Sequence, residues 1–316
     1  MTASARRTAP RIVYLDEPTY ITAGFLTALA RLGSVQVYYD RPGPEEATRR
    51  LVGTDVAVVE WTRLTREILC RAEGLGHVAT VLSATDQVDL TAARELGISV
   101  SHCPRYSIDS VADHLMSCAA TLLRRLLPAH AAAGAGVQHR YVPYLGREPR
   151  GLVLGLLGTG HIGRAVAARA AQLGMRVIGT NGSGKPVPGI ETVSLEELVR
   201  RCDVLSVQVP ARPETTGLLS ADLVTLLRPG AVVLSVSRHS VIDTDALLHL
   251  HRAGGLGGVA LDDPPAHLVP EFAKVPNTLL TPGIAWYTDR ARKENLHEVL
   301  GNIRSHLSGG NRNAVV

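Results

Sequence analysis

The sequence predicts an α/β fold made of two doubly wound parallel-sheet domains with a cleft between them. Short apolar runs alternate with segments of helical period, and this alternation occurs twice, on either side of a long helix and an Ala/Gly-rich stretch. Strands that alternate with helices pair in parallel, because each crossover returns the chain to the same edge of the sheet. A chain of 316 residues, 45% of them hydrophobic, can bury a core in each domain.

We expect the strands of the first series at 11–16, 36–39, 56–60, 79–83 and 98–103. The segments between them carry apolar residues at helical spacing and end on glycine, a common helix stop, as in FLTALARLG, EEATRRLVG and LTAARELG.

The longest helical pattern covers 107–127, and the stretch 129–151 is expected to have little regular structure. We expect the strands of the second series at 153–158, 176–181, 203–209, 231–237, 258–262 and 278–282. A capping box of Ser194 and Glu197 begins one intervening helix, and the last helix is expected over 289–307.

Charge, cysteine spacing and hydropathy argue against a nucleic-acid partner, a metal site and a membrane-spanning segment. The net charge of +4 is small and scattered, so no nucleic-acid partner is expected, although mild basicity suits an anionic small molecule. Cys70, Cys103, Cys118 and Cys202 have no metal-ligand spacing, which predicts free thiols and no metal. No apolar run is long enough to span a membrane, so a cytoplasmic protein is expected.

A Gly-x-Gly-x-x-Gly motif between a strand and a helix predicts a dinucleotide site. The predicted cofactor-binding segment comprises Gly158, Thr159, Gly160, His161, Ile162 and Gly163. Gly158 allows the tight turn, Gly160 lets the backbone approach a pyrophosphate, and Gly163 lets helix and strand pack closely. The alternative is that the glycines serve only a tight turn.

The end of the next strand bears on the choice between NADP and NAD. Asn181 stands where an acidic residue would bind the ribose hydroxyls of NAD, and it lacks the charge that would repel a 2′-phosphate. Ser183 and Lys185 follow and offer a hydroxyl and a cation. This pattern favours NADPH over NADH. The alternative is an Asn181 bonded to the ribose and a solvated Lys185.

Five segments together resemble the D-isomer-specific 2-hydroxyacid dehydrogenases: SVADHLM (110–116), CDVLSVQVPARPETTGLL (202–219), LRPGAVVLSVSRHSVIDTDALL (227–248), GVALDD (258–263) and NTLLTPGIAWYT (277–288). The AWYT ending is similar to the branch containing the C-terminal-binding co-repressors. The resemblance implies a Rossmann-like dinucleotide-binding domain, residues 106–285, inserted into a flavodoxin-like substrate domain. The latter comprises residues 1–105 and 286–316. It also implies a homodimer formed through the dinucleotide domain.

The resemblance carries roles to particular residues. Arg238 matches the arginine that holds the substrate carboxylate and polarises the carbonyl, a task that suits a planar and permanently charged guanidinium. Asp262 matches an aspartate near the nicotinamide. The segments expected to line the nicotinamide pocket comprise Val209, Pro210, Val236 and Ser237.

The catalytic pair of the family is missing. Gly283 stands where the family has its histidine acid/base, and DDPPAHLVPEF has no carboxylate where a glutamate would orient that histidine. The loop expected to bind the substrate carboxylate keeps Ser83 and Ala84 but lacks the family's glycines. These changes predict an atypical active site.

Two explanations of Gly283 follow. Loss of a general acid costs ~10²–10⁴ in rate, so another donor is needed for a ketone, and His239 and Tyr287 are candidates beside His267 and Asp263. Alternatively the substrate is a cationic iminium or a conjugated acceptor, which needs no enzyme acid. Trp286 is a candidate substrate contact.

The leading interpretation is an NAD(P)H-dependent oxidoreductase that acts on CH–OH or a related C=O, C=N or C=C group. The alternative is a non-catalytic dinucleotide-binding protein that acts as a sensor or protein partner.

Overall fold

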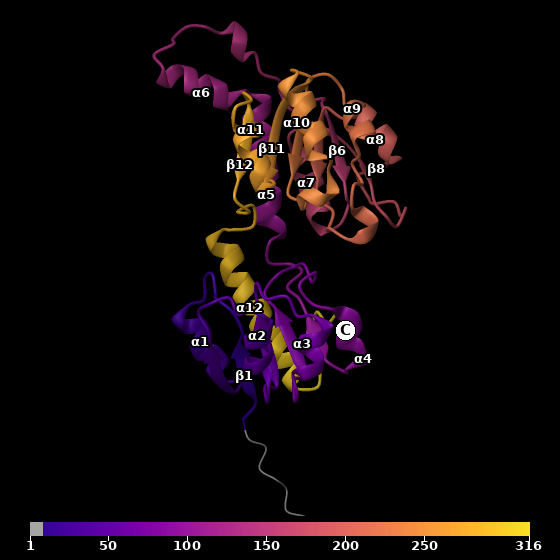
Figure 1. Cartoon of the computed structure of the whole chain (residues 1–316). Coiled ribbons are helices and arrows are strands. Elements are labelled where there is room, and N and C mark those ends of the chain that lie inside the picture. The colour runs from indigo at the N-terminus through magenta and orange to yellow at the C-terminus, as the bar shows by residue number, and fades with distance from the viewer. Residues whose placement is uncertain (1–8) are drawn as a thin grey trace, which may run out of the picture. The chain divides into compact units, whose positions relative to one another are not determined.

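The computed structural model describes residues 9–316, which form two compact units, each with its own parallel sheet (Figure 1). Unit 1 contains the described residues up to Ser107 together with Thr288–Val316, and unit 2 contains Ile108–Tyr287. The predicted α/β class with two parallel-sheet units is confirmed. The expected functional domains, 1–105 with 286–316 and 106–285, stay a prediction, and their residues 1–8 lie outside the described part.

Unit 1 has a five-stranded sheet in the order β2-β1-β3-β4-β5. Its strands are β1 (Arg11–Tyr14), β2 (Ser34–Val37), β3 (Val56–Val59), β4 (His77–Thr80) and β5 (Ser99–Ser101). Its helices are α1 (Ala23–Ala30), α2 (Pro44–Leu51), α3 (Arg66–Arg71), α4 (Leu90–Glu95) and α12 (Asp289–Leu307). Helix α3 packs between α2 and α4, whereas α12 packs on β4 and against α1. The sheet is therefore covered on both faces, which explains its fully buried central strands.

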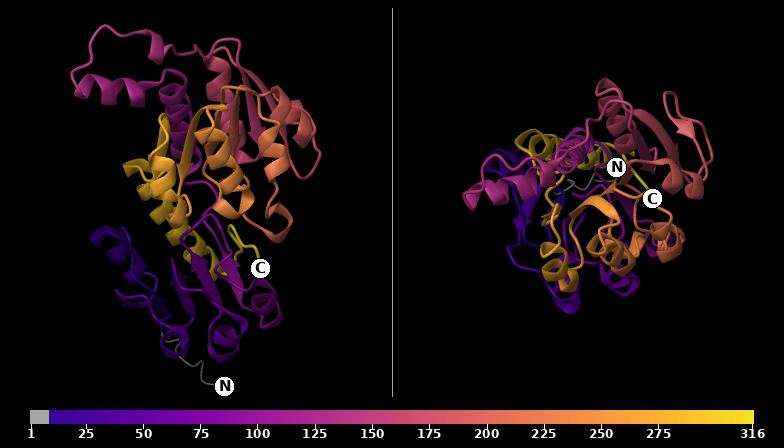
Figure 2. Two further views of the ribbon diagram at one scale, coloured as in Figure 1. Left: turned by 45° about the horizontal axis from the view of Figure 1, so that its top comes forward. Right: turned by 90° about the horizontal axis from the view of Figure 1, so that it is seen from above.

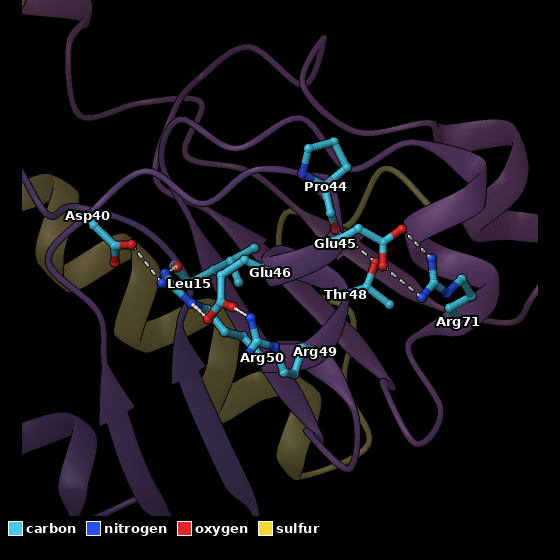
Figure 3. Close-up of polar contacts among 9 residues, drawn as sticks. All are labelled: Leu15, Asp40, Pro44, Glu45, Glu46, Thr48, Arg49, Arg50 and Arg71. Atoms are coloured by element: carbon cyan, nitrogen blue, oxygen red, sulfur yellow. Dashed lines mark hydrogen bonds and ion pairs between the residues drawn. The ribbon is translucent and has the colours of Figure 1, made fainter.

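A buried arginine joins α2 to the carboxyl edge of this sheet (Figure 3). The guanidinium of Arg50 donates to Leu15 O at 3.1 Å, Asp40 Oδ2 at 2.7 Å and Glu46 Oε1 at 2.8 Å. It also lies 3.9 Å from the ring centroid of Tyr38. Removing the guanidinium would leave a buried carbonyl unpaired, so Arg50 stabilises the loops after β1 and β2.

Unit 2 has a seven-stranded sheet in the order β12-β11-β10-β9-β6-β7-β8. Its strands are β6 (Val153–Leu157), β7 (Arg176–Thr180), β8 (Glu191–Thr192), β9 (Val204–Val207), β10 (Ala231–Ser235), β11 (Leu256–Asp262) and β12 (Thr278–Thr281). Its α-helices are α5 (Ile108–Leu123), α6 (Leu126–Gly134), α7 (His161–Gln172), α8 (Leu195–Arg201), α9 (Ala221–Thr225), α10 (Thr244–Arg252) and α11 (Val269–Ala273). Short 3₁₀ helices are η1 (Val142–Tyr144), η2 (Pro213–Thr215), η3 (His239–Val241) and η4 (Ala266–Leu268).

All strand pairs of unit 2 are parallel, so their carboxyl ends meet at one edge. One apolar cluster includes α5 and α7 residues, and another includes α8 and α10 residues on the other face of the sheet. From β6 the chain adds β7 and β8 on one side, and it then returns to add β9 to β12 on the other side. The order of strand addition therefore reverses between the neighbouring strands β6 and β9. Ligands of open α/β sheets bind at the carboxyl edge beside such a reversal.

The structure corrects four expected elements. The strand expected at 36–39 is β2 and begins two residues earlier, because it is a half-exposed edge strand with a weak apolar pattern. The strand expected at 79–83 is β4 and also begins two residues earlier, at His77, a polar residue that is buried. The helix expected over 107–127 ends at Leu123, since Arg125 adopts a left-handed φ of 51°. The stretch expected to lack regular structure contains most of α6, whose alanines favour helix. Helix α12 confirms the expected 289–307.

Across residues 9–316, we find no helix with both the length and the apolar content needed to cross a bilayer.

Candidate active site

The site residues predicted in unit 2 follow the carboxyl ends of six strands. They lie in the turns after β6, β7, β9, β10, β11 and β12, at 158–163, 181–185, 209–210, 236–239, 262–263 and 283–287. The parallel pairing therefore gathers residues from 130 positions of sequence along one edge.

The glycine-rich turn after β6 has the backbone that a pyrophosphate site requires. Gly158 adopts φ +103°, and a Cβ there would lie 2.8 Å from Val209 Cγ1. A Cβ on Gly163 would lie 2.2 Å from Gly158 O, so helix and turn touch through backbone. Gly160 differs, because its missing Cβ would meet no heavy atom of the described residues within 4 Å, apart from its chain neighbours. The turn thus has open space at the start of α7, where a phosphate would meet backbone N–H groups.

Gln208 holds this turn from the neighbouring strand. Its amide nitrogen donates to Gly158 O at 2.6 Å, and its carbonyl accepts from Ser206 Oγ at 2.6 Å. Gln208 therefore joins the turn after β6 to the end of β9.

Asn181 organises the loop after β7. Its side-chain nitrogen donates to Thr159 Oγ1 at 2.8 Å and Lys185 O at 3.0 Å, while its oxygen accepts from the backbone and hydroxyl of Ser183. Ser183 Oγ also accepts from Lys185 N at 3.3 Å. The loop is a turn built around a neutral amide, and it presents an exposed lysine.

The two segments expected to line the nicotinamide pocket are joined by one hydroxyl. Ser237 Oγ donates to Val209 O at 2.8 Å and accepts from Val209 N at 3.0 Å. Because Ser237 is buried, this exchange fixes the loop after β10 against the loop after β9. Val236 and Pro210 are adjacent to this joint in sequence.

Asp262 holds the turn after β12. Its Oδ1 accepts from Thr281 Oγ1 at 2.7 Å and from Ile284 N at 2.8 Å, and its Oδ2 accepts from Ala285 N at 2.9 Å. Three charge-assisted hydrogen bonds on one carboxylate give this aspartate a positioning role, whatever it contributes to cofactor binding.

The space beside Gly283 is not filled by its neighbours. The backbone there has φ +74°, a conformation that L side chains rarely adopt. A Cβ would lie 3.7 Å from Asp263 Cβ, the only heavy atom of the described residues within 4 Å besides the chain neighbours. Gly283 is therefore required by its backbone conformation, and it leaves room in front of the turn.

Arg238 and Asp263 form an ion pair next to this space. Arg238 Nη1 lies 3.0 Å from Asp263 Oδ2, and their side chains are 55% and 56% exposed. Asp263 has φ +62°, which is uncommon outside glycine, and its backbone N–H donates to Thr281 O at 2.8 Å. From the sequence, Asp263 is only one of several candidate proton donors. The Asp-Asp doublet after a buried strand was the signal that could have selected it.

The other candidate donors lie at different places on the same edge. His239 begins η3 and, with Ser237, Asp262 and Asp263, borders a small cavity of about 10 Å³. Tyr287 is 44% exposed and meets Trp286 edge to face at 5.1 Å. Trp286 packs against the apolar cluster of α5 and α7.

Ser83 and Ala84 follow β4 in unit 1, and both are exposed. His102 Nδ1 donates to Ser83 O at 2.8 Å. Their predicted role toward the substrate carboxylate stays a prediction.

The four cysteines are free thiols. Over the described residues, no group of three or more His, Cys, Asp or Glu side chains is arranged to hold a metal ion.

Comparison with known proteins identifies relatives over the whole described chain. Residues 116–285 match the family model described as D-isomer specific 2-hydroxyacid dehydrogenase, NAD binding domain. A glycerate dehydrogenase of Methylorubrum extorquens is 28% identical over 283 residues, 86% of this chain and 88% of that protein. A D-3-phosphoglycerate dehydrogenase of Haemophilus influenzae is 34% identical over 79% of this chain and 63% of its own length.

Solved structures give the same fold. An acyclic imino acid reductase in complex with NADPH and D-Arg has a TM-score of 0.93 and 35% identity, covering 97% of this chain and all of that one. A D-lactate dehydrogenase from Aquifex aeolicus complexed with NAD and lactic acid has a TM-score of 0.84 and 27% identity. The match covers 95% of this chain and 96% of that one.

Proposed function

Because the chain belongs to the D-isomer specific 2-hydroxyacid dehydrogenase family, a family of NAD(P)-dependent oxidoreductases, we propose that it is an NADPH-dependent reductase of acyclic 2-imino acids. The observation that carries this proposal is the turn after β12. There Gly283 leaves open space beside the Arg238–Asp263 pair and supplies no acid. The likeness to an acyclic imino acid reductase supports the same substrate class.

The charge of the substrate explains why no acid is needed. A ketone that accepts a hydride becomes an alkoxide, which must be protonated at once, and losing a positioned acid costs ~10²–10⁴ in rate. The chemistry that the bound nicotinamide supplies is a hydride for the imine carbon, so that the π pair of a protonated C=N bond becomes the nitrogen lone pair. The product is a neutral amine, which takes a proton from water later.

The residues of this site suit an anionic carboxylate. Arg238 presents an exposed guanidinium beyond the carboxyl end of β10 and pairs with Asp263, whose Cβ borders the space at Gly283. A guanidinium binds both oxygens of a carboxylate through a planar pair of donors. We assign Arg238 to the substrate carboxylate and Asp262 to holding the turn in place.

The cofactor is proposed to be NADPH. The open space at Gly160 and the uncapped start of α7 fit a pyrophosphate. Asn181 shapes its loop without adding a negative charge, and Ser183 and Lys185 in that loop offer a hydroxyl and a cation to a 2′-phosphate. Asn181→Asp should therefore weaken NADPH binding by about tenfold or more, because a carboxylate repels the phosphate. Titration with NADPH and NADH tests this, and an unchanged ratio of the two dissociation constants would contradict it.

The first experiment measures NADPH oxidation at 340 nm with a 2-oxoacid, with and without ammonium or methylamine, which generate the imine in solution. We expect turnover that requires the amine and yields an amino acid identified by mass spectrometry. Arg238→Ala should remove it. Equally fast turnover without the amine would refute the imine assignment. Tight NADPH binding with no oxidation under any condition would favour the non-catalytic sensor or partner.

A homodimer through unit 2 is a further part of this proposal. Helix α6 buries none of its residues, and it projects with the following loop from the rest of unit 2 (Figures 1 and 2). Tyr141, Val142 and Leu145 in that loop are 76%, 88% and 83% exposed. Large apolar side chains at this exposure mark an interaction surface. Val142→Asp with Leu145→Asp should shift the mass in light scattering from dimer to monomer, and an unchanged mass would argue against this interface.

A further inference from the structure

We propose that Asp263 binds the cationic imine nitrogen while Arg238 binds the carboxylate, so that the two side chains recognise the substrate as a zwitterion. This inference rests on the proposed function and names the residue that selects imino acids over 2-oxoacids and 2-hydroxyacids. Its basis is the ion pair that these two side chains form at the border of the space left by Gly283.

Asp263 is held in place by the backbone on both sides. The preceding carboxylate, Asp262, is anchored by three hydrogen bonds to the turn after β12. The Asp263 N–H donates to Thr281 O at 2.8 Å. Its Cβ lies 3.7 Å from the point where a side chain of residue 283 would begin. The Asp263 side chain therefore begins beside the position from which a side chain of residue 283 would extend.

The ion pair can exchange partners with a zwitterion. Both side chains are more than half exposed, and an ion pair at such exposure contributes little to stability. An imino acid offers a carboxylate to Arg238 and a cationic N–H to Asp263. Each charge is then satisfied again, and the total number of charge-assisted contacts does not fall.

The same arrangement disfavours substrates without a cation. A 2-oxoacid would place only carbonyl lone pairs near the Asp263 carboxylate, and a 2-hydroxyacid would offer it a neutral O–H donor. In both cases binding leaves this negative charge without a cationic partner, because Arg238 is taken by the substrate carboxylate. A carboxylate beside a protonated imine also raises the pKa of that imine, which keeps more of it in the reactive form. Asp263 thus acts on both specificity and protonation.

The positive φ of Asp263 allows two substitutions that remove its charge without straining the backbone. Asparagine tolerates positive φ almost as well as aspartate does, and glycine prefers it. Asp263→Asn and Asp263→Gly therefore both remove the charge without a backbone penalty at φ +62°. Asp113→Asn is the matched control, because Asp113 forms an exposed ion pair with Arg169 in the same unit, on α5 and α7.

The test uses the full chain loaded with NADP⁺ and measures binding of D-alanine and D-lactate, with the L-forms in parallel, by calorimetry. We expect Asp263→Asn and Asp263→Gly to weaken alanine binding by about tenfold or more and to leave lactate binding equal or tighter. The Asp113→Asn variant should bind both as the unmodified protein does. Equal losses for alanine and lactate, or no loss for alanine, would overturn the role of Asp263.

A pH profile separates this inference from the proposed function. In the amine-dependent assay, Asp263→Asn should move the alkaline limb of kcat to lower pH, since the imine in the enzyme–substrate complex loses its stabilising carboxylate. An unmodified enzyme that reduces imines, with an Asp263→Asn profile identical to it, would refute the inference alone. Absence of amine-dependent turnover in the unmodified enzyme would refute the proposed function instead.

Discussion

Two glycine turns at the same edge of unit 2 require glycine for different reasons. Gly158 after β6 and Gly283 after β12 both have positive φ, at +103° and +74°. Around Gly158 the neighbouring backbone and Val209 leave no room for a Cβ, which would approach Val209 to 2.8 Å. Around Gly283 only Asp263 comes within 4 Å, among described residues other than the chain neighbours.

The turn at Gly158 therefore needs glycine because of its packing, and we call it the closed turn. The turn at Gly283 needs glycine only for its positive φ, and we call it the bent turn. The first has close backbone contacts at Gly158 and Gly163, and it is open only at Gly160, where a pyrophosphate would approach. On our proposal, the second leaves space for a substrate beside Asp263, the ion-pair partner of Arg238. One residue type thus serves cofactor binding at one strand end and, on our proposal, substrate access at another.

The largest effect is expected in the closed turn. Gly163→Ala would put a methyl group 2.2 Å from Gly158 O, and backbone cannot yield as a side chain can. We expect NADPH binding to fall by ~100-fold or more, or unit 2 to unfold. Gly160→Ala is the control, since its Cβ would meet no heavy atom of residues 9–316 within 4 Å, apart from its chain neighbours. It should keep the melting temperature and lose only cofactor affinity. Equal melting temperatures and equal NADPH affinities for the two variants would contradict the difference between close packing at Gly163 and open space at Gly160.

The second largest effect concerns Asp262, which holds the bent turn in place. Asp262→Ala removes three accepted hydrogen bonds and should lower the free energy of unfolding by about 2 kcal/mol. Turnover should fall with it because the turn beside Arg238 loosens. Urea unfolding and amine-dependent NADPH oxidation measure the two losses. A variant with normal stability and normal turnover would show that this carboxylate does not position the turn.

A smaller effect is expected at Gly283 itself. Alanine there fits the space but costs about 1 kcal/mol for its positive φ, so turnover should drop only a few-fold. Gly283→His should not create 2-oxoacid reduction, because the left-handed backbone and the missing glutamate leave the imidazole poorly oriented. Fast, amine-independent reduction of glyoxylate by Gly283→His would contradict this and would point to the ordinary family chemistry.

The smallest effect lies away from both turns, in unit 1. His77 is buried against β5 and stacks on His306 with ring centroids 4.3 Å apart. Burial, followed by the facing His306, lowers the pKa of His77 to about 3. The folded protein therefore leaves His77 neutral where the unfolded chain, with a pKa near 6.5, takes up a proton, and stability falls as pH drops from 6.5 toward 3.

Protonation of His77 in the unfolded chain should lower the free energy of unfolding by about 1 kcal/mol between pH 7.5 and 5.5. His77→Gln should remove this loss in urea unfolding at the two pH values, followed by the fluorescence of Trp61 in a Trp286→Phe background, which reports on unit 1 alone. A pH dependence that survives in His77→Gln would assign the acid loss to another group. His306 of unit 1, which stacks on His77 and has a pKa lowered by burial, is the next candidate.

Local pattern was enough for most elements and for the cofactor turn. The apolar runs of β6 and β10 and the glycines at 158, 160 and 163 act through nearest neighbours in sequence, so their structure follows from spacing. Edge strand β2 and the polar start of β4 were misplaced by two residues. In both, contacts with the rest of the sheet outweigh the local pattern.

The sequence by itself determined that this protein has two parallel-sheet units, a Gly-x-Gly-x-x-Gly turn and a glycine at position 283, because each follows from residues that are neighbours in the chain. Only the tertiary structure decided that Asp263 borders Gly283 and pairs with Arg238. These residues are far apart in sequence and meet through strand register, since Asp262 lies opposite Thr281 and Ser235 opposite Leu261. Two positive-φ residues just beyond those strand ends then turn the chain so that Asp263 and the space at Gly283 face each other.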